Sequence, residues 1–145
     1  MRHTQSNHYN HYNHYNHYVV MFLIMVISGL LSTMNVWVDK LDDIRISLND
    51  VYMILLMSGW MLLFMGIIYK SMSAFLFGLA LVICNIWCIR AQFLISESQY
   101  KVGMIPHHSM AVHMSKKLLE KENTITPFLN NLIQTQENEI VFLKK

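Results

Sequence analysis

Charged side chains are scarce in this sequence. Only 14% of its 145 residues are Asp, Glu, Lys or Arg, whereas 54% are hydrophobic. A soluble domain usually has about 25% charged residues, so this composition points to a lipid bilayer. The formal net charge of +2 is small and scattered, which argues against nucleic acid as a partner. The length suffices for one domain or a small set of helices, but not for a large soluble α/β enzyme.

Cysteine is also scarce, and motifs of catalysis are missing. The two cysteines, Cys84 and Cys88, lie four residues apart in an apolar run, where neighbours on one helix face do not readily form a disulfide. The sequence contains no nucleophile with a base and an orienting group, no glycine-rich phosphate loop and no zinc-protease motif. It also lacks the Glu-X-X-His pairs of a di-iron bundle. The sequence therefore predicts a protein that is not an enzyme.

A polar repeat forms the N-terminal tail. Residues 7–18 read NHYNHYNHYNHY, which is one triplet repeated four times. Such a segment lacks the apolar side chains of a core, so we expect residues 1–18 to be disordered. The tail does not follow the pattern of a signal peptide. Its histidines could converge on a metal ion, or the repeat could be a neutral expansion.

Three hydrophobic segments follow the tail. Residues 19–38 and 51–69 are long enough to cross about 30 Å of hydrocarbon as helices. Residues 74–89 are shorter, but Lys70 and Arg90 can extend towards the lipid headgroups at the two ends. A helix satisfies its own backbone hydrogen bonds, as a bilayer requires. The region 19–90 is therefore predicted to make an integral, multi-pass membrane protein with three spans, whose partner is the lipid bilayer.

An odd number of spans places the N-terminal tail and the C-terminal segment on opposite sides of the membrane. Basic residues are slightly more numerous on the side of the C-terminal segment, and this favours a cytoplasmic C-terminus. The margin is too small to decide the orientation, which stays open.

Residues 91–145 have the composition of a soluble helical hairpin. We expect a first helix over about residues 92–121, interrupted or kinked near Pro106. The second helix is predicted to begin with Thr126 as its N-cap and Pro127 at its first position. Two helices make a thin core, so the membrane helices or a second protomer would have to complete it. The expected fold class is all-α, with three transmembrane helices followed by a soluble two-helix hairpin.

Histidine and methionine crowd the first helix of this hairpin. At about 100° per residue, one side of the helix carries four possible metal ligands, and we expect that side to face the second helix. The four are Met104, His107, His108 and Met114, with Met110 at the border and His113 pointing away. On the second helix, Gln136 lies in the apolar stripe and Glu139 at its edge, and either could hold an imidazole N–H behind the ligands.

Two interpretations of this cluster are open. Imidazole suits copper and zinc, and thioether sulfur is soft and selects Cu(I), so the cluster could be a copper site used in storage, sensing or tolerance. Alternatively, methionine fills gaps in the core and the histidine pair bonds to Gln136 or Glu139. The protein would then be a membrane scaffold or assembly protein whose histidine pair is structural.

The same residues carry a resemblance to domain-of-unknown-function family 305. The family pattern is a Met-Ile-Pro-His-His block with a downstream Ala and Met, then a Gln followed three residues later by Glu-Ile. Its positions here are Met104, Ile105, Pro106, His107, His108, Ala111, Met114, Gln136, Glu139 and Ile140. The resemblance covers about residues 96–145, and the methionine-studded hydrophobic segments look like those of the multi-span members.

The resemblance implies a ferritin-like helical hairpin or bundle. Some members bind copper outside the cytoplasm through the His and Met positions, which favours copper over zinc at His107 and His108 on ligand softness. Two features depart from the family pattern. Leu143 stands where a methionine often follows the Glu-Ile pair, and the chain carries one copy of a unit that some members carry twice. A complete bundle would then require a homo-oligomer.

Overall fold

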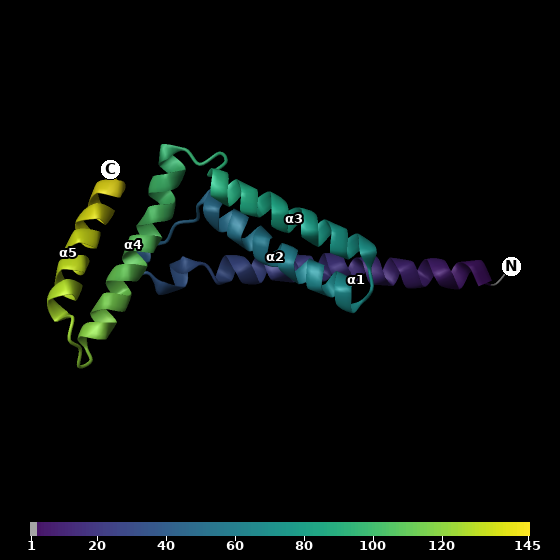
Figure 1. Cartoon of the computed structure of the whole chain (residues 1–145), viewed down its shortest axis with the longest axis horizontal. Coiled ribbons are helices and arrows are strands. Elements are labelled where there is room, and N and C mark those ends of the chain that lie inside the picture. Colours follow the sequence, from purple (N-terminus) through teal and green to yellow (C-terminus); the bar gives the residue numbers. More distant parts are fainter. Residues whose placement is uncertain (1–2) are drawn as a thin grey trace. The chain divides into compact units, whose positions relative to one another are not determined.

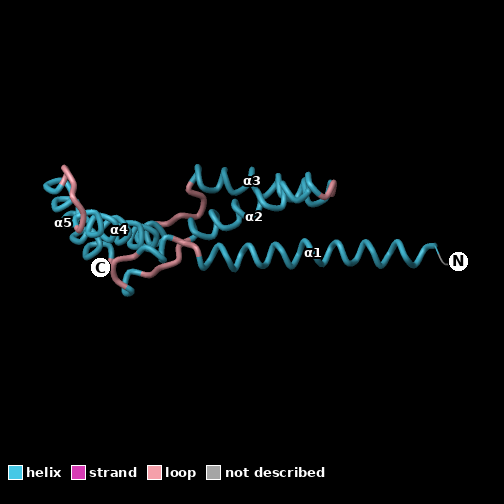
Figure 2. The backbone as a smooth tube through the Cα atoms, turned by 90° about the horizontal axis from the view of Figure 1, so that it is seen from below, coloured by secondary structure: helices cyan, strands magenta, loops and turns pink. Residues whose placement is uncertain are grey.

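The computed structural model describes the backbone of residues 3–145 and the side chains of residues 16–145. Over this part of the chain the fold is all-helical without a strand, which confirms the all-α part of the predicted fold class (Figures 1 and 2). The α-helices are α1 (His3–Leu31), α2 (Leu48–Ile68), α3 (Met72–Ala91), α4 (Glu97–Leu119) and α5 (Thr126–Leu143). Two short 3-10 helices, η1 (Met34–Trp37) and η2 (Leu41–Asp43), lie between α1 and α2 in the chain.

The chain divides into two compact units. The first, which we call the span unit, contains the chain up to Leu30 and Tyr52–Ala91. The second, which we call the hairpin unit, contains Leu31–Val51 and Gln92–Lys145. Each unit therefore combines segments that are distant in the sequence.

The described residues contain three helical segments that are long and apolar enough to cross a membrane. They are Asn16–Trp37, Leu48–Ile68 and Met72–Ala91, each with a mean hydropathy of 2.2. These correspond to the three hydrophobic segments predicted from the sequence. The first α-helix itself already ends at Leu31.

The N-terminal repeat differs from the prediction. The sequence predicts disorder over residues 1–18. Residues 1–2 lie outside the described part of the chain, and from His3 onward α1 continues through the repeat into the apolar segment. Helix nucleation is costly but extension is not, because each added residue contributes one further hydrogen bond. An apolar helix that has already formed can therefore be extended by a polar repeat that could not fold alone.

In the span unit, α2 and α3 lie side by side (Figures 1 and 2). They approach each other closely at two glycines. A Cβ atom on Gly78 would lie 2.4 Å from the nitrogen of Leu63 and 2.8 Å from the oxygen of Gly59. A Cβ atom on Gly66 would lie 2.4 Å from the nitrogen of Phe75. No side chain fits at these distances, so the glycines permit backbone contact of the kind that small residues give membrane helices.

In the hairpin unit, α4 packs along α5. The predicted stripe of α5 faces this contact, because Leu129 and Ile140 are buried and Gln136 is half-buried. The helix begins at Thr126, one residue before the predicted Pro127, and its N-cap residue is Ile125, which makes no side-chain cap hydrogen bond. Thr126 instead donates its hydroxyl to Oδ1 of Asn123, 3.0 Å away. The predicted Thr126 N-cap is therefore shifted by one residue.

The start and the course of α4 also differ from the prediction. The helix begins at Glu97 rather than near residue 92, because Ser96 caps it by accepting a hydrogen bond from the backbone N–H of Gln99. Before this cap, Gln92 and Leu94 have left-handed φ values of 48° and 56°, which a helix does not allow. The helix then continues through Pro106, where an interruption or kink was expected.

A third layer of the hairpin unit was not predicted. The residues between α1 and α2, 32–47, pack through η1 and η2 on α4. We call them the connecting segment. α4 is therefore the middle element of this unit, with α5 and the connecting segment both packed against it.

Candidate functional site

The buried face of α4 is not the one predicted. Ile105, Ser109 and Val112 are buried, whereas His107 is exposed and the side chain of Met114 is 52% exposed. The expectation that His107 and Met114 face the partner helix is therefore wrong. The physical reason is that α4 is packed by two partners, since the connecting segment covers a side that was assumed to be open. The buried face consequently shifts by about one residue, or about 100° around the helix.

His108 keeps its predicted position in the hairpin. Its side chain is 12% exposed, and Nδ1 lies 2.9 Å from Oε2 of Glu139 on α5. The contact has the distance of an ion pair, although Nδ1 is not aligned for a hydrogen bond. The imidazole of His107 lies beside it, with ring centroids 6.0 Å apart and planes inclined by 70°. The two neighbouring histidines therefore have different environments, one against α5 and one at the surface.

The soft ligands lie mainly on the outer side of α4. His107, Met110 and Met114 fall within roughly 60° of the helix circumference, and Met104 lies one turn before His107. Met104 and Met110 are half-buried. His113, which the sequence placed on the opposite side, is half-buried, as is Gln136 on α5. The structure thus separates the predicted cluster into an inner residue, His108, and an outer stripe of one imidazole and three thioethers.

No group of three or more His, Cys, Asp or Glu side chains among the described residues is arranged to hold a metal ion. The donors that do share one face of α4 include methionine sulfur. Such a set matches a soft ion such as Cu(I) better than zinc or a hard cation.

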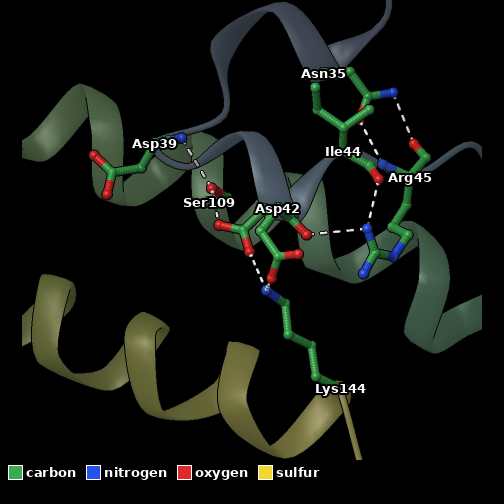
Figure 3. Close-up of polar contacts among 8 residues, drawn as sticks. Asn35, Asp39, Asp42, Ile44, Arg45, Ser109 and Lys144 are labelled. Carbon is green, nitrogen blue, oxygen red and sulfur yellow. Dashed lines mark hydrogen bonds and ion pairs between the residues drawn. The ribbon is translucent and has the colours of Figure 1, made fainter.

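A buried polar network ties the connecting segment to α4 (Figure 3). Ser109 is fully buried at its centre. Its hydroxyl donates to Oδ2 of Asp43 at 2.6 Å and accepts the backbone N–H of Asp39 at 2.9 Å. Asp43 itself is only 2% exposed. A buried carboxylate is costly unless it is paired, so these contacts fix the segment on the helix.

Two lysines complete this network from the hairpin. The ammonium of Lys144 lies 2.7 Å from Oδ1 of Asp43 and also contacts Asp42 (Figure 3). The hydrogen bond to Asp42, followed by the ion pair with Asp43, raises the pKa of Lys144 above its usual value. Lys116 bridges Asp39 at 2.8 Å and Glu137 at 3.0 Å. Its pKa is raised as well, chiefly by the hydrogen bond to Asp39.

Asp39, Asp43, Ser109, Glu137 and Lys144 border a cavity of about 290 Å³ between the connecting segment, α4 and α5. Lys144 contacts Asp42 and Asp43, and Lys116 contacts Asp39 and Glu137, so each of these two lysines is shared by two carboxylates. The arrangement works as a polar latch, by which we mean the contacts among Asp39, Asp43, Ser109, Lys116 and Lys144.

The sequence contained a signal for this latch that the prediction did not use. Asn35, Asp39, Asp43 and Ser47 recur every four residues in the connecting segment. The side chain of Asn35 accepts the backbone N–H of Arg45 at 2.9 Å and donates to the carbonyl of Arg45 at 2.7 Å. Polar residues at such a spacing mark one side of a segment, but only the structure shows that this side is the buried one.

The fold defines a chain with three helices able to cross a membrane and a separate unit built on a helical hairpin. Comparison with known proteins places this chain in a family. It is 42% identical over 131 residues to the uncharacterized protein L153 of Acanthamoeba polyphaga mimivirus, covering 83% of this chain and 86% of that protein. The chain belongs to the family of that protein. No family model matches the sequence. No solved structure matches it either.

Proposed function

We propose that this chain is an integral membrane protein whose hairpin unit binds copper as Cu(I) and serves copper storage, sensing or tolerance without catalysis. The observation that carries the proposal is the outer stripe of α4, where an exposed imidazole and three thioethers share one side of a helix. Soluble helices usually present charged or polar side chains there, so four soft or borderline donors in one stripe require an explanation.

The spacing of the stripe suits a shared ion. Residues three or four positions apart on a helix have Cβ atoms about 5–6 Å apart, within reach of one ion held by long side chains. Met110 is three residues from His107 and four from Met114. We assign these three residues as the principal ligands, with Met104 as a further donor one turn away. A thioether-rich set with one imidazole favours Cu(I).

His108 has a supporting role in this proposal. Its contact with Glu139 orients the imidazole against α5, behind the helix face that carries the ligands. Residues behind a metal site commonly orient it in this way. The resemblance of residues 104–108 to family 305, some of whose members bind copper, supports the same assignment.

Cu(I) titration of the full-length protein in detergent, against a competing chelator under reducing conditions, tests the proposal. Met110→Leu/Met114→Leu and His107→Ala should each weaken Cu(I) binding about tenfold or more, because each loses a soft or imidazole donor. Met53→Leu/Met57→Leu is the matched control, since it removes two exposed thioethers from α2. Equal affinity in all four proteins would refute the proposal, as would equal binding by a His107→Ala/His108→Ala variant.

A second candidate function is assembly. Six residues of α4 recur at spacings of four and three, the heptad pattern of a helix–helix seam. They are Tyr100, Met104, His107, Ala111, Met114 and Leu118. Tyr100, Met114 and Leu118 are 53%, 52% and 38% exposed, so the described chain leaves this seam uncovered. A second copy packed on the seam would complete a ferritin-like four-helix bundle and make the protein a membrane scaffold.

Sedimentation of the full-length protein in detergent tests assembly. Leu118→Glu should dissociate the oligomer, because it places a charge in the seam. Thr135→Glu, an exposed change on α5, is the control and should leave the oligomer intact. A monomeric wild type would exclude this candidate. The melting temperature of the His107→Ala/His108→Ala variant further separates the two candidates. A lower melting temperature that added copper does not change favours a structural role of the histidine pair.

A further inference from the structure

The connecting segment has the reverse polarity of an ordinary surface segment. Asp43 and Ser47 are 2% and 4% exposed, and the side chain of Asp39 is 16% exposed. Beside the charged Lys40 and Asp42, the outer side carries five large apolar residues. They are Val36, Trp37, Leu41, Ile44 and Ile46, which are 68%, 54%, 83%, 43% and 56% exposed.

Exposing this many apolar side chains of one segment to water is unfavourable. Single exposed apolar residues are common on soluble proteins, but a contiguous group usually marks a binding surface. Here Asp39 and Asp43 are committed to the polar latch and Asn35 to Arg45, while Asp42, which is exposed, is paired with Lys144. The segment therefore requires an apolar or amphipathic environment on its outer side.

The chain itself indicates which environment this is. The connecting segment starts directly after α1 and ends directly before α2, and both helices are long and apolar enough to cross a membrane. A segment of this length between two spans begins and ends at the same membrane surface. Two basic residues lie on the segment. Lys40 is exposed, and the guanidinium of Arg45 donates hydrogen bonds to the carbonyls of Asp42 and Ile44, so that its positive charge lies beside the backbone of the segment (Figure 3).

We propose that the outer face of the connecting segment lies in the headgroup layer of the bilayer, with Trp37 and Leu41 inserted and the polar latch directed away from lipid. Tryptophan is enriched at this depth because its ring is apolar and its N–H polar. Lys40 and Arg45 favour anionic headgroups beside the inserted residues. The hairpin unit is then anchored at the bilayer surface by the connecting segment, which packs on α4. This inference rests on the membrane part of the proposed function and not on copper binding.

Tryptophan fluorescence in lipid vesicles tests this placement. The chain has three tryptophans, Trp37, Trp60 and Trp87. Trp60→Phe/Trp87→Phe leaves Trp37 as the reporter, and Trp37→Phe/Trp87→Phe leaves Trp60, in the middle of α2, as a depth reference. Both full-length variants are reconstituted into vesicles with brominated lipids, whose bromines lie either near the headgroups or near the bilayer centre. Circular dichroism of each variant checks that its helix content equals that of the wild type.

Trp37 should be quenched several-fold more by bromines near the headgroups than by bromines near the centre, and only weakly by aqueous iodide. Trp60 should show the opposite depth preference. Strong iodide quenching of Trp37 without lipid quenching would place the segment in water and overturn the inference. Protection of Trp37 from both quenchers would show a protein partner or a second copy on this face, and would overturn it equally. Loss of lipid quenching at Trp60 would refute the spanning helices themselves, whatever the outcome of the copper titration.

Discussion

The two units of this chain use opposite means to hold their helices together. In the span unit, α2 and α3 touch through backbone at Gly66 and Gly78, where even a methyl group would collide. In the hairpin unit, the connecting segment is joined to α4 by the buried hydroxyl of Ser109 and the buried carboxylate of Asp43, and to the end of α5 by the ion pair of Asp43 with Lys144. Lipid offers little hydrophobic drive between helices, so close contact and shape must supply the stabilisation there.

The comparison shows why each strategy suits its unit. The span helices carry few polar groups, and their association depends on the absence of side chains at two contacts. The hairpin unit has a thin apolar core, in which Ile105, Val112, Leu129 and Ile140 are the buried aliphatic residues. Polar contacts that are specific in geometry compensate for this small core and determine which face of α4 is buried.

Lys144→Met should destabilise the hairpin unit by about 3 kcal/mol, because it leaves the buried carboxylate of Asp43 without its cation. Lys121→Met, at an exposed lysine, is the control and should change the stability little. Denaturant titration in detergent, followed by circular dichroism, measures both. Asp43→Asn added to Lys144→Met should recover part of the loss, since it removes the unpaired charge. If the single variant were as stable as the wild type, the polar latch would have no stabilising role.

Gly78→Ala should destabilise the span unit by about 1–3 kcal/mol, since the added methyl group collides with the backbone of α2. Gly103→Ala in α4 is the matched change in the hairpin unit. There the new methyl group would meet the side chain of Ser47, at 3.1 Å from its hydroxyl oxygen and 3.3 Å from its Cβ, and better helix propensity offsets the tight contact. Unfolding in mixed detergent micelles compares the two. Equal losses of stability in the two variants would contradict the claim that only the span unit depends on close backbone contact at glycine.

Alkaline pH should weaken the hairpin unit through Lys144. The pKa of this lysine is raised in the folded state, so its contribution is complete below the usual value of 10.5 and is lost as the pH rises through the higher folded value. Thermal melting at a series of pH values from about 9 upward measures this loss. The fall of the melting temperature with rising pH should be less steep in Lys144→Met, because methionine does not titrate. An unchanged slope would assign the alkaline loss to other groups.

Glu139→Gln should have the smallest effect, about 0.5 kcal/mol, because the Glu139 side chain is 47% exposed and solvent screens its contact with His108. The melting temperature in detergent reports this change, and Glu122→Gln in the exposed loop before α5 serves as its control. A large loss would show that the two helices depend on this contact more than on their apolar stripe.

The sequence predicted the elements of the fold well and their partners less well. Hydropathy identified the three apolar helices, and periodicity identified the stripe of α5 that contains Leu129 and Ile140. Both properties are local. The face of α4 could not be derived in this way, because it depends on Ser109 meeting Asp43 across 66 residues of sequence. Helical spacing alone grouped His107 with His108, whereas packing by two partners separates them.

The most direct test of the copper proposal is the X-ray absorption spectrum of the full-length protein loaded with Cu(I) at one equivalent. The proposal predicts sulfur neighbours together with imidazole nitrogen, and a loss of the sulfur contribution in Met110→Leu/Met114→Leu. A spectrum with only nitrogen and oxygen neighbours, or one that the double variant leaves unchanged, would contradict the assignment of the outer stripe of α4 as a metal site.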